Sequence, residues 1–166
     1  MDNFKQKLTH VTCFIFDVDG VLTDGSLQLL PGGEQIRTMN IRDGYALQAA
    51  VKAGYRVAII SGGKSESVRT RLNGLGVKDV YLGADDKSEK FDELANLYEL
   101  KAENILYMGD DMPDFEVMKK SGVATCPADA APEIKTICHY VSQKKGGEGC
   151  ARDVIEQVMR LHEKWK

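Results

Sequence analysis

Five short runs of mainly apolar residues divide the chain, each five or six residues long. Their length and their lack of alternation are typical of strands that are covered on both faces. The runs lie at residues 11–16, 56–60, 79–83, 104–109 and 122–126. We therefore expect a sheet of buried strands at the centre of the protein.

Helical periodicity fills the intervals between these runs. Phe91, Leu94, Ala95 and Tyr98 recur at i, i+3, i+4 and i+7, and a similar apolar stripe begins at Val154. Strands that alternate with helices favour parallel pairing with helices on both faces of the sheet. The pattern predicts an α/β fold, a Rossmann-like three-layer sandwich with a mainly parallel sheet.

Two segments depart from the alternation. Residues 25–40 carry two short apolar stretches around a Pro-Gly-Gly turn, which predicts a small β-hairpin inserted after the first strand. Residues 144–150 are rich in glycine and lysine, which is typical of a mobile connector. Because 166 residues are enough for one buried core and few for two, we expect a single domain over residues 1–166.

Composition narrows the choice of partners. The 22 basic and 25 acidic residues give a formal net charge of -3, so we expect neither nucleic acid nor a membrane surface as a partner. The N-terminus lacks the apolar run of a signal peptide, and we expect a soluble, cytoplasmic protein. The four cysteines have no CxxC spacing, so we interpret them as free thiols.

Polar residues that suit phosphate chemistry follow the predicted strands. Asp17 and Asp19 follow the first strand, Ser61 the second and Asp110 the fourth, and Lys87 comes soon after the third. Ligands of open α/β sheets bind beyond the carboxyl ends of the strands, so these side chains should share one rim. Several carboxylates in one crevice repel each other unless a hard cation neutralises them, which indicates Mg²⁺.

This set of groups predicts a phosphatase with a covalent intermediate. Asp17 would attack phosphorus while Lys87 and the Ser61 hydroxyl screen the charge of the phosphate. Asp19, two residues further along an extended segment, would protonate the leaving oxygen and later activate water. We therefore expect an aspartyl-phosphate intermediate and release of inorganic phosphate.

The motifs DVDGVLTDG and GDDMPD, with Ser61 and Lys87 between them, resemble the haloacid dehalogenase superfamily of phosphatases in order and spacing. The resemblance implies that Mg²⁺ is held by the Asp17 carboxylate, the Asp19 backbone carbonyl and Asp110. It also implies that Ser61 and Lys87 contact the transferred phosphate. Two more acidic residues would support the metal site from outside, and these are Asp111 and Asp114, the latter orienting Lys87.

A narrower resemblance rests on TDG, NIRDGYAL and GGEG with Arg152, which are similar to the capless subfamily that hydrolyses 3-deoxy-D-manno-octulosonate 8-phosphate. It implies a step in lipopolysaccharide precursor synthesis, carried out by a homotetramer whose neighbouring subunits help to close each site. A carboxylate on the sugar would meet basic side chains near the rim. The candidate sugar contacts are Thr23, Asn40, Arg42, Asp43, Gly62, Lys64 and Arg69.

A capless site is open to water, so something else should cover it. We hypothesise that the hairpins bring several chains together and that the segment around residues 146–149 folds over a neighbouring site.

Other functions remain open at this stage. Relatives that act on nine-carbon keto-sugar 9-phosphates share the same motifs. A receiver-like phosphorylation switch also accepts phosphate on an aspartate, but the third predicted strand here ends in YLG and offers no acceptor. A phosphomutase would need a large cap, for which the chain has no insertion, and a non-catalytic assembly subunit would not need both Asp17 and Asp19.

Overall fold

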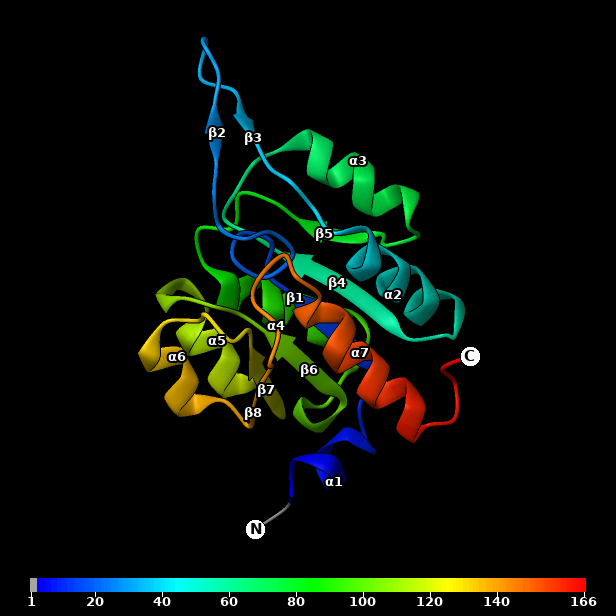
Figure 1. Ribbon diagram of the computed structural model, residues 1–166. Coiled ribbons are helices and arrows are strands. Elements are labelled where there is room, and N and C mark those ends of the chain that lie inside the picture. Colours follow the sequence, from blue (N-terminus) through cyan, green and yellow to red (C-terminus); the bar gives the residue numbers. More distant parts are fainter. Residues whose placement is uncertain (1–2) are drawn as a thin grey trace.

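A six-stranded sheet with the order β5-β4-β1-β6-β7-β8 lies at the centre of the computed structural model (Figure 1). The structure describes residues 3–166, so the first two residues of the expected domain lie outside it. Every pairing within this sheet is parallel. The strands are β1 (Cys13–Phe16), β4 (Arg56–Ile60), β5 (Asp79–Tyr81), β6 (Ile105–Met108), β7 (Val123–Cys126) and β8 (Tyr140–Val141). The expected parallel sheet is confirmed, and β8 adds a two-residue edge strand that no apolar run indicates.

Helices cover both faces of the sheet. Consecutive residues of a strand point to opposite faces, so each strand contributes side chains to both layers of the core. In β1, Phe14 and Phe16 pack with α2, α3 and α7, whereas Cys13 and Ile15 pack with α4, α5 and α6. All four side chains are fully buried. The helices are α1 (Phe4–Leu8), α2 (Ile41–Lys52), α3 (Glu66–Gly74), α4 (Lys87–Leu97), α5 (Phe115–Lys120), α6 (Pro132–Ile137) and α7 (Cys150–Leu161), with 3₁₀ turns η1 (Ala102–Asn104) and η2 (Met112–Asp114). The three-layer sandwich is therefore confirmed.

The inserted segment forms the expected hairpin. Strands β2 (Gln28–Leu29) and β3 (Gln35–Ile36) pair antiparallel and project from the body of the protein (Figure 1). Their residues are exposed to solvent, including the apolar Leu29 and Ile36. The hairpin thus adds little to the core of one chain and stands beside the carboxyl ends of β1 and β4.

Among residues 3–166, no helix combines the length and the apolar character that crossing a bilayer requires.

Candidate active site

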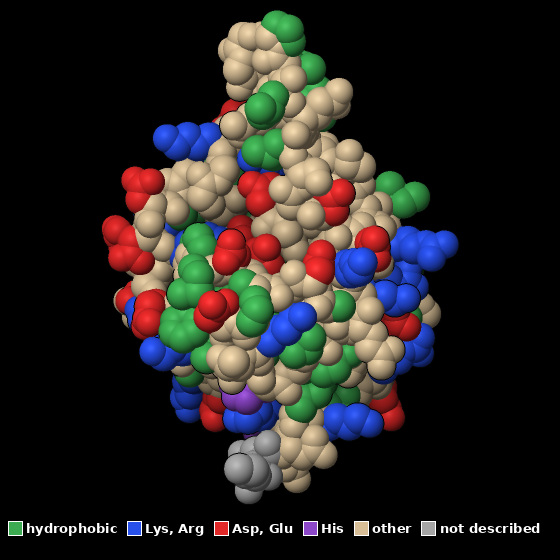
Figure 2. Space-filling model, turned by 60° about the vertical axis from the view of Figure 1, so that its left-hand side comes forward, with side chains coloured by type: hydrophobic (Ala, Val, Ile, Leu, Met, Phe, Trp, Pro, Cys, Tyr) green, Lys and Arg blue, Asp and Glu red, His purple; other side chains and the backbone are tan. Residues whose placement is uncertain are grey.

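A depression of about 890 Å³ lies at the carboxyl ends of the parallel strands. Because Phe16 pairs in register with both Ile59 and Met108, the residues that follow these strands emerge at the same level. Figure 2 shows acidic side chains gathered on this face of the protein, below the hairpin. Eight of the residues predicted from the sequence line this rim depression: Asp17, Asp19, Ser61, Gly62, Lys87, Asp110, Asp111 and Asp114.

Three carboxylates converge at its floor. Asp17, Asp110 and Asp114 each offer an oxygen atom, and these atoms lie within 4.8 Å of one another. Burial, followed by repulsion from Asp114, raises the pKa of Asp17 well above its ordinary value and raises the pKa of Asp110 to about 7. So much acidic charge with a single ammonium beside it requires another cation, and an oxygen-only donor set suits Mg²⁺.

Lys87 supplies the ammonium group. As the first residue of α4 it is buried, and its Nζ lies 3.0 Å from Asp17 Oδ1 and 2.8 Å from Asp114 Oδ1. Asp114 Oδ1 also accepts a hydrogen bond of 2.7 Å from the hydroxyl of Tyr107, and its Oδ2 accepts one from the Asp110 backbone. These bonds fix Lys87 between the two carboxylates, so that its charge faces any group that approaches Asp17.

The loop after β1 depends on a glycine and a threonine. Gly20 has a φ of +86°, and a Cβ atom there would overlap the Asp110 carboxylate. Thr23 is fully buried, and its Oγ1 accepts hydrogen bonds of 3.2 Å from the backbone N–H groups of Gly20 and Gly25. Thr23, expected as a sugar contact, therefore shapes this loop through its hydrogen bonds.

Two other expected sugar contacts lie at helix ends. The Asn40 side chain caps α2 by accepting from the Arg42 backbone, and its amide donates to the Gly147 carbonyl at 3.0 Å. Asp43 is buried, and its Oδ1 accepts a 2.9 Å hydrogen bond from the Arg152 backbone in the first turn of α7. Because the N-cap of α7 is Gly149, which has no side chain, Asp43 of α2 does the capping instead.

The three basic candidates do not line the rim depression within one chain. Arg69 donates to the Val80 carbonyl and to Glu66, and Arg42 lines a separate hollow beside α7. The aliphatic part of Lys64 lies against Gly83. Of the seven expected sugar contacts, only Gly62 lines the rim depression.

Residues 144–149 pack against the loop after β1 of their own chain. The Gly146 backbone donates to Asp129 at 2.9 Å, and the Gly147 backbone donates to the Val21 carbonyl at 3.0 Å. A Cβ atom on Gly146 would overlap the Gly20 carbonyl, so the contact is backbone against backbone. These bonds join the segment that was expected to be a mobile connector to its own chain.

Arg37, at the end of the hairpin, was not expected from the sequence to contribute to the site. Its Nε lies 2.6 Å from Asp19 Oδ1 and its Nη2 lies 3.1 Å from Asp19 Oδ2, a two-bond ion pair. No local pattern around Arg37 indicates this contact, because it depends on how the hairpin curves back over the rim. Asp111, by contrast, accepts from the Met112 backbone and starts η2.

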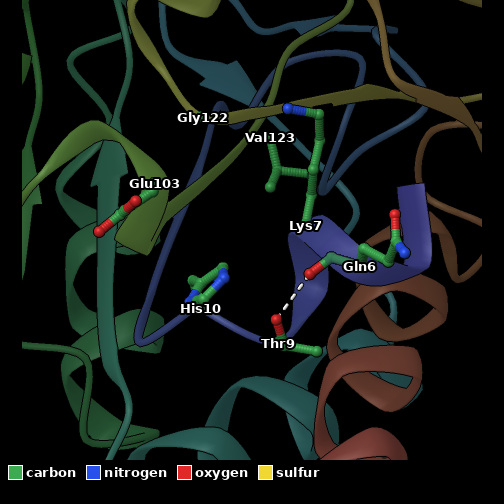
Figure 3. A pocket seen from close by; sticks show the side chains of 7 residues that line it. All are labelled: Gln6, Lys7, Thr9, His10, Glu103, Gly122 and Val123. Atoms are coloured by element: carbon green, nitrogen blue, oxygen red, sulfur yellow. Dashed lines mark hydrogen bonds between the residues drawn. The ribbon is translucent and has the colours of Figure 1, made fainter. Parts of the chain in front are cut away.

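Another hollow, of about 450 Å³, lies near the amino ends of the strands (Figure 3). Its polar lining includes Lys7, His10 and Glu103, which come from the N-terminal segment and η1 and do not converge on one point (Figure 3). The converging charges are therefore at the carboxyl end. Fold and rim together define the class of protein: an α/β protein with a parallel sheet and a cluster of acidic side chains at its carboxyl edge that could hold a cation.

Comparison with known proteins narrows this class. Residues 83–153 match the family described as haloacid dehalogenase-like hydrolase. The chain is 34% identical to the 3-deoxy-D-manno-octulosonate 8-phosphate phosphatase KdsC of Yersinia pestis, over 98% of this chain and 87% of that relative. It is 36% identical to the KdsC of Escherichia coli K12, over 92% of this chain and 81% of the relative. The chain belongs to the haloacid dehalogenase-like hydrolases, as its motifs indicate.

Solved structures agree with this assignment. The crystal structure of the Yersinia pestis phosphatase superposes with a TM-score of 0.95, covering 98% of this chain and 88% of that chain at 34% identity. The Moraxella catarrhalis phosphatase, solved in complex with magnesium ion, phosphate ion and KDO, gives a TM-score of 0.91 at 30% identity and covers 95% of this chain and 91% of that one. The protein is thus a phosphomonoester hydrolase by family and by fold.

Proposed function

We propose that the protein is a Mg²⁺-dependent phosphatase that hydrolyses 3-deoxy-D-manno-octulosonate 8-phosphate to the free sugar acid and inorganic phosphate. The observation that carries this proposal is the buried group of Asp17, Asp110 and Asp114 around Lys87, in a fold whose relatives carry the name of that reaction. The magnesium, phosphate and KDO in the Moraxella catarrhalis relative support the same ligand chemistry.

The chain offers three oxygen donors for the ion. The carboxylates of Asp17 and Asp110 and the backbone carbonyl of Asp19 would hold it, while Asp114 is already engaged by Lys87 and Tyr107. When bound, Mg²⁺ supplies positive charge that neutralises the phosphoryl oxygens. Burial and repulsion from Asp114 raise the pKa of Asp17, and the positive charge of a bound ion would counteract this and favour the ionised carboxylate that a nucleophile needs.

In the first half of the reaction, a carboxylate oxygen of Asp17 attacks phosphorus and the bond to the sugar oxygen breaks. Lys87, 3.0 Å from Asp17 Oδ1, and the buried hydroxyl of Ser61 bind the phosphoryl oxygens during transfer. Asp19 donates its proton to the departing sugar oxygen. The products of this half are the free sugar acid and the Asp17 acyl phosphate.

In the second half, Asp19 accepts a proton from water, whose oxygen then attacks phosphorus. The bond between phosphorus and the Asp17 oxygen breaks, which releases inorganic phosphate and restores the Asp17 carboxylate. The proton that Asp19 gave to the sugar is thereby replaced, so no other reactant is needed.

We also infer a homotetramer in which the hairpin contributes to assembly. The apolar side chains of Leu27, Leu29 and Ile36 are 40%, 70% and 40% exposed and follow one projecting element. Exposed apolar groups concentrated on one protrusion favour association. In a single chain, the active site is bordered only by its own hairpin. In the assembly, a neighbouring subunit would supply residues that cover the site.

The test is steady-state kinetics on a panel of phosphates with Mg²⁺ present. We expect kcat/KM for the octulosonate 8-phosphate to exceed those for nine-carbon keto-sugar 9-phosphates and for p-nitrophenyl phosphate. Replacing Asp17 or Asp110 with Asn should lower kcat by a factor of about 1,000 or more while leaving the far-UV spectrum unchanged. A 9-phosphate as the best substrate, or full activity in Asp17→Asn, would contradict the proposal.

The intermediate can be tested separately. Acid quench of a single turnover with labelled substrate should leave phosphate on the wild-type protein and none on Asp17→Asn. Release of one equivalent of phosphate without further turnover would indicate a receiver-like switch instead of a phosphatase.

A further inference from the structure

The guanidinium of Arg37 is the second cation of the rim, and it lies at a different place from the Lys87 ammonium. Lys87 contacts Asp17 and Asp114, whereas Arg37 contacts both oxygens of Asp19. The Arg37 side chain is only 6% exposed, although it extends from a hairpin whose strands are solvent-exposed. An arginine is rarely buried unless it is paired, so this side chain is committed to the site.

Gly63 leaves the space that Arg37 occupies. A Cβ atom at Gly63 would lie 3.0 Å from Arg37 Nη2, 3.4 Å from Asp19 Oδ2 and 3.5 Å from Ser61 Oγ. Gly20 and Gly25 have a positive φ, which favours glycine, but Gly63 does not. The absence of a side chain at this position is therefore best explained by room for the guanidinium.

The position of Arg37 relative to the reaction follows from its partner. In the function proposed above, Asp19 protonates the leaving oxygen, so Asp19 borders the alcohol part of the substrate. Because Arg37 is bonded to both Asp19 oxygens, its guanidinium borders that same part of the substrate. Nη1 of Arg37 makes no hydrogen bond to any residue of the described chain from 3 to 166, so its N–H groups remain available.

We propose that Arg37 is a specificity-determining residue, which binds oxygen atoms of the leaving alcohol through Nη1 while Nε and Nη2 hold Asp19. A planar guanidinium can serve two oxygen-bearing partners at once along different edges, and it prefers carboxylates and hydroxyl-rich groups. The inference rests on the proposed function and adds a substrate class to it: alcohols with a carboxylate or several hydroxyl groups. Gly63 contributes because it has no side chain and so leaves room for the guanidinium of Arg37.

The experiment compares selectivity, defined as kcat/KM for 3-deoxy-D-manno-octulosonate 8-phosphate divided by kcat/KM for p-nitrophenyl phosphate. The second substrate has a leaving group without carboxylate or hydroxyl groups. We expect Arg37→Gln to lower selectivity about 10- to 100-fold. Arg37→Lys keeps the charge but cannot form the fork, so it should restore only part of the selectivity.

Gly63→Ala provides an independent variant, because it displaces the guanidinium without removing its charge. It should lower selectivity in the wild-type background and have no further effect in Arg37→Gln, since the two residues act through one contact. Arg160→Gln removes an exposed arginine on α7 and serves as the control, with both kinetic constants unchanged.

Equal losses on both substrates, or unchanged selectivity in Arg37→Gln, would overturn the role of Arg37. The wild-type protein tests the proposed function on its own: no preference for the octulosonate ester would refute that function. In that case, selectivity is measured with the sugar-acid phosphate of the panel that has the highest kcat/KM. A lower selectivity in Arg37→Gln supports the role of Arg37, and an unchanged selectivity overturns it.

Discussion

At the scale of single residues, Gly20 has the most demanding position in the site. Its φ of +86° disfavours any other residue, and the Asp110 carboxylate occupies the place of a Cβ atom. The close contact brings the loop of Asp17 and Asp19 against the loop of Asp110. Gly20 thus sets the separation of the two groups that we assign to the metal.

Gly20→Ala should therefore weaken Mg²⁺ binding and lower kcat/KM by a factor of about 100 or more, because Asp110 must move. The measurement is the rise in melting temperature on adding Mg²⁺, together with turnover. Gly54→Ala is the matched control, since Gly54 has a φ of +92° but nothing within 4 Å of the added Cβ. A normal Mg²⁺ response in Gly20→Ala would show that Asp110 does not depend on this contact.

His139 makes stability depend on pH. Its Nδ1 accepts a 2.9 Å hydrogen bond from the Ala124 backbone, and burial followed by the charge of Lys7 lowers its pKa from the ordinary 6.5. The folded protein then binds fewer protons than the unfolded chain just below pH 6.5. The free energy of unfolding should accordingly fall as the pH drops from 6.5 toward the lowered pKa, and His139 should add no further loss below it.

Urea denaturation at pH 7.5 and at pH 5.5 checks this expectation for the wild type and for His139→Asn, whose amide oxygen can still accept. The loss of stability between the two pH values should be smaller in the variant. The same loss in both proteins would assign the pH dependence to other groups.

The gathering of polar side chains at one rim could be predicted from the sequence, whereas the hydrogen-bond partners of side chains on the loops could not. Asp17, Ser61 and Asp110 directly follow apolar strands, and parallel pairing alone brings such positions to one edge. Asn40 and Arg37 depend on how loops bend in three dimensions. No local sequence pattern therefore indicates that Asn40 donates to Gly147 or that Arg37 pairs with Asp19.

At the scale of elements, α7 depends on a cap from another helix. Asp43 of α2 accepts from the Arg152 backbone, while its Oδ2 is buried without a partner among the described residues. Burial raises the pKa of Asp43, so the interaction carries a cost. The cap nevertheless joins α2 and α7, which pack together along one face of the sheet.

Asp43→Ala should lower the free energy of unfolding by about 1 kcal/mol, the usual effect of losing an N-cap. Asp43→Asn keeps the accepting oxygen and should lose less. Urea unfolding monitored by circular dichroism gives both values. Equal losses in the two variants would mean that the carboxylate charge, and not the accepted hydrogen bond, matters.

Element prediction succeeded where a continuous apolar run marked a buried strand. The apolar runs at 56–60 and 104–109 correspond to β4 and β6 within a residue at each end. Strand β8 and helices α1, α5 and α6 have two, five, six and six residues, too few to show a period. Tertiary packing, and not local preference, determines these short elements.

At the scale of the whole molecule, the hairpin serves two proposed purposes, since it carries both the exposed apolar side chains and Arg37. Leu29, 70% exposed, is the best position at which to separate them. Leu29→Glu should convert the assembly to monomers, because a buried charge without a partner opposes association.

Sedimentation velocity at several concentrations checks the change in mass, and kcat/KM for the sugar phosphate should fall with it. Gln28→Glu, on the same strand, introduces the same charge at a polar position and should leave the assembly intact. A fully active wild-type monomer would remove the assembly proposal.

The floor of the site joins Asp17 to Asp110, about ninety residues apart in the chain. During synthesis, a ribosome must therefore complete β6 before any nascent chain can capture an ion at this place. The ion's binding free energy then stabilises only molecules in which β1 and β6 are already paired. Magnesium in solution would thus stabilise chains in which β1 and β6 have paired and leave incomplete chains unaffected, in addition to its role in catalysis.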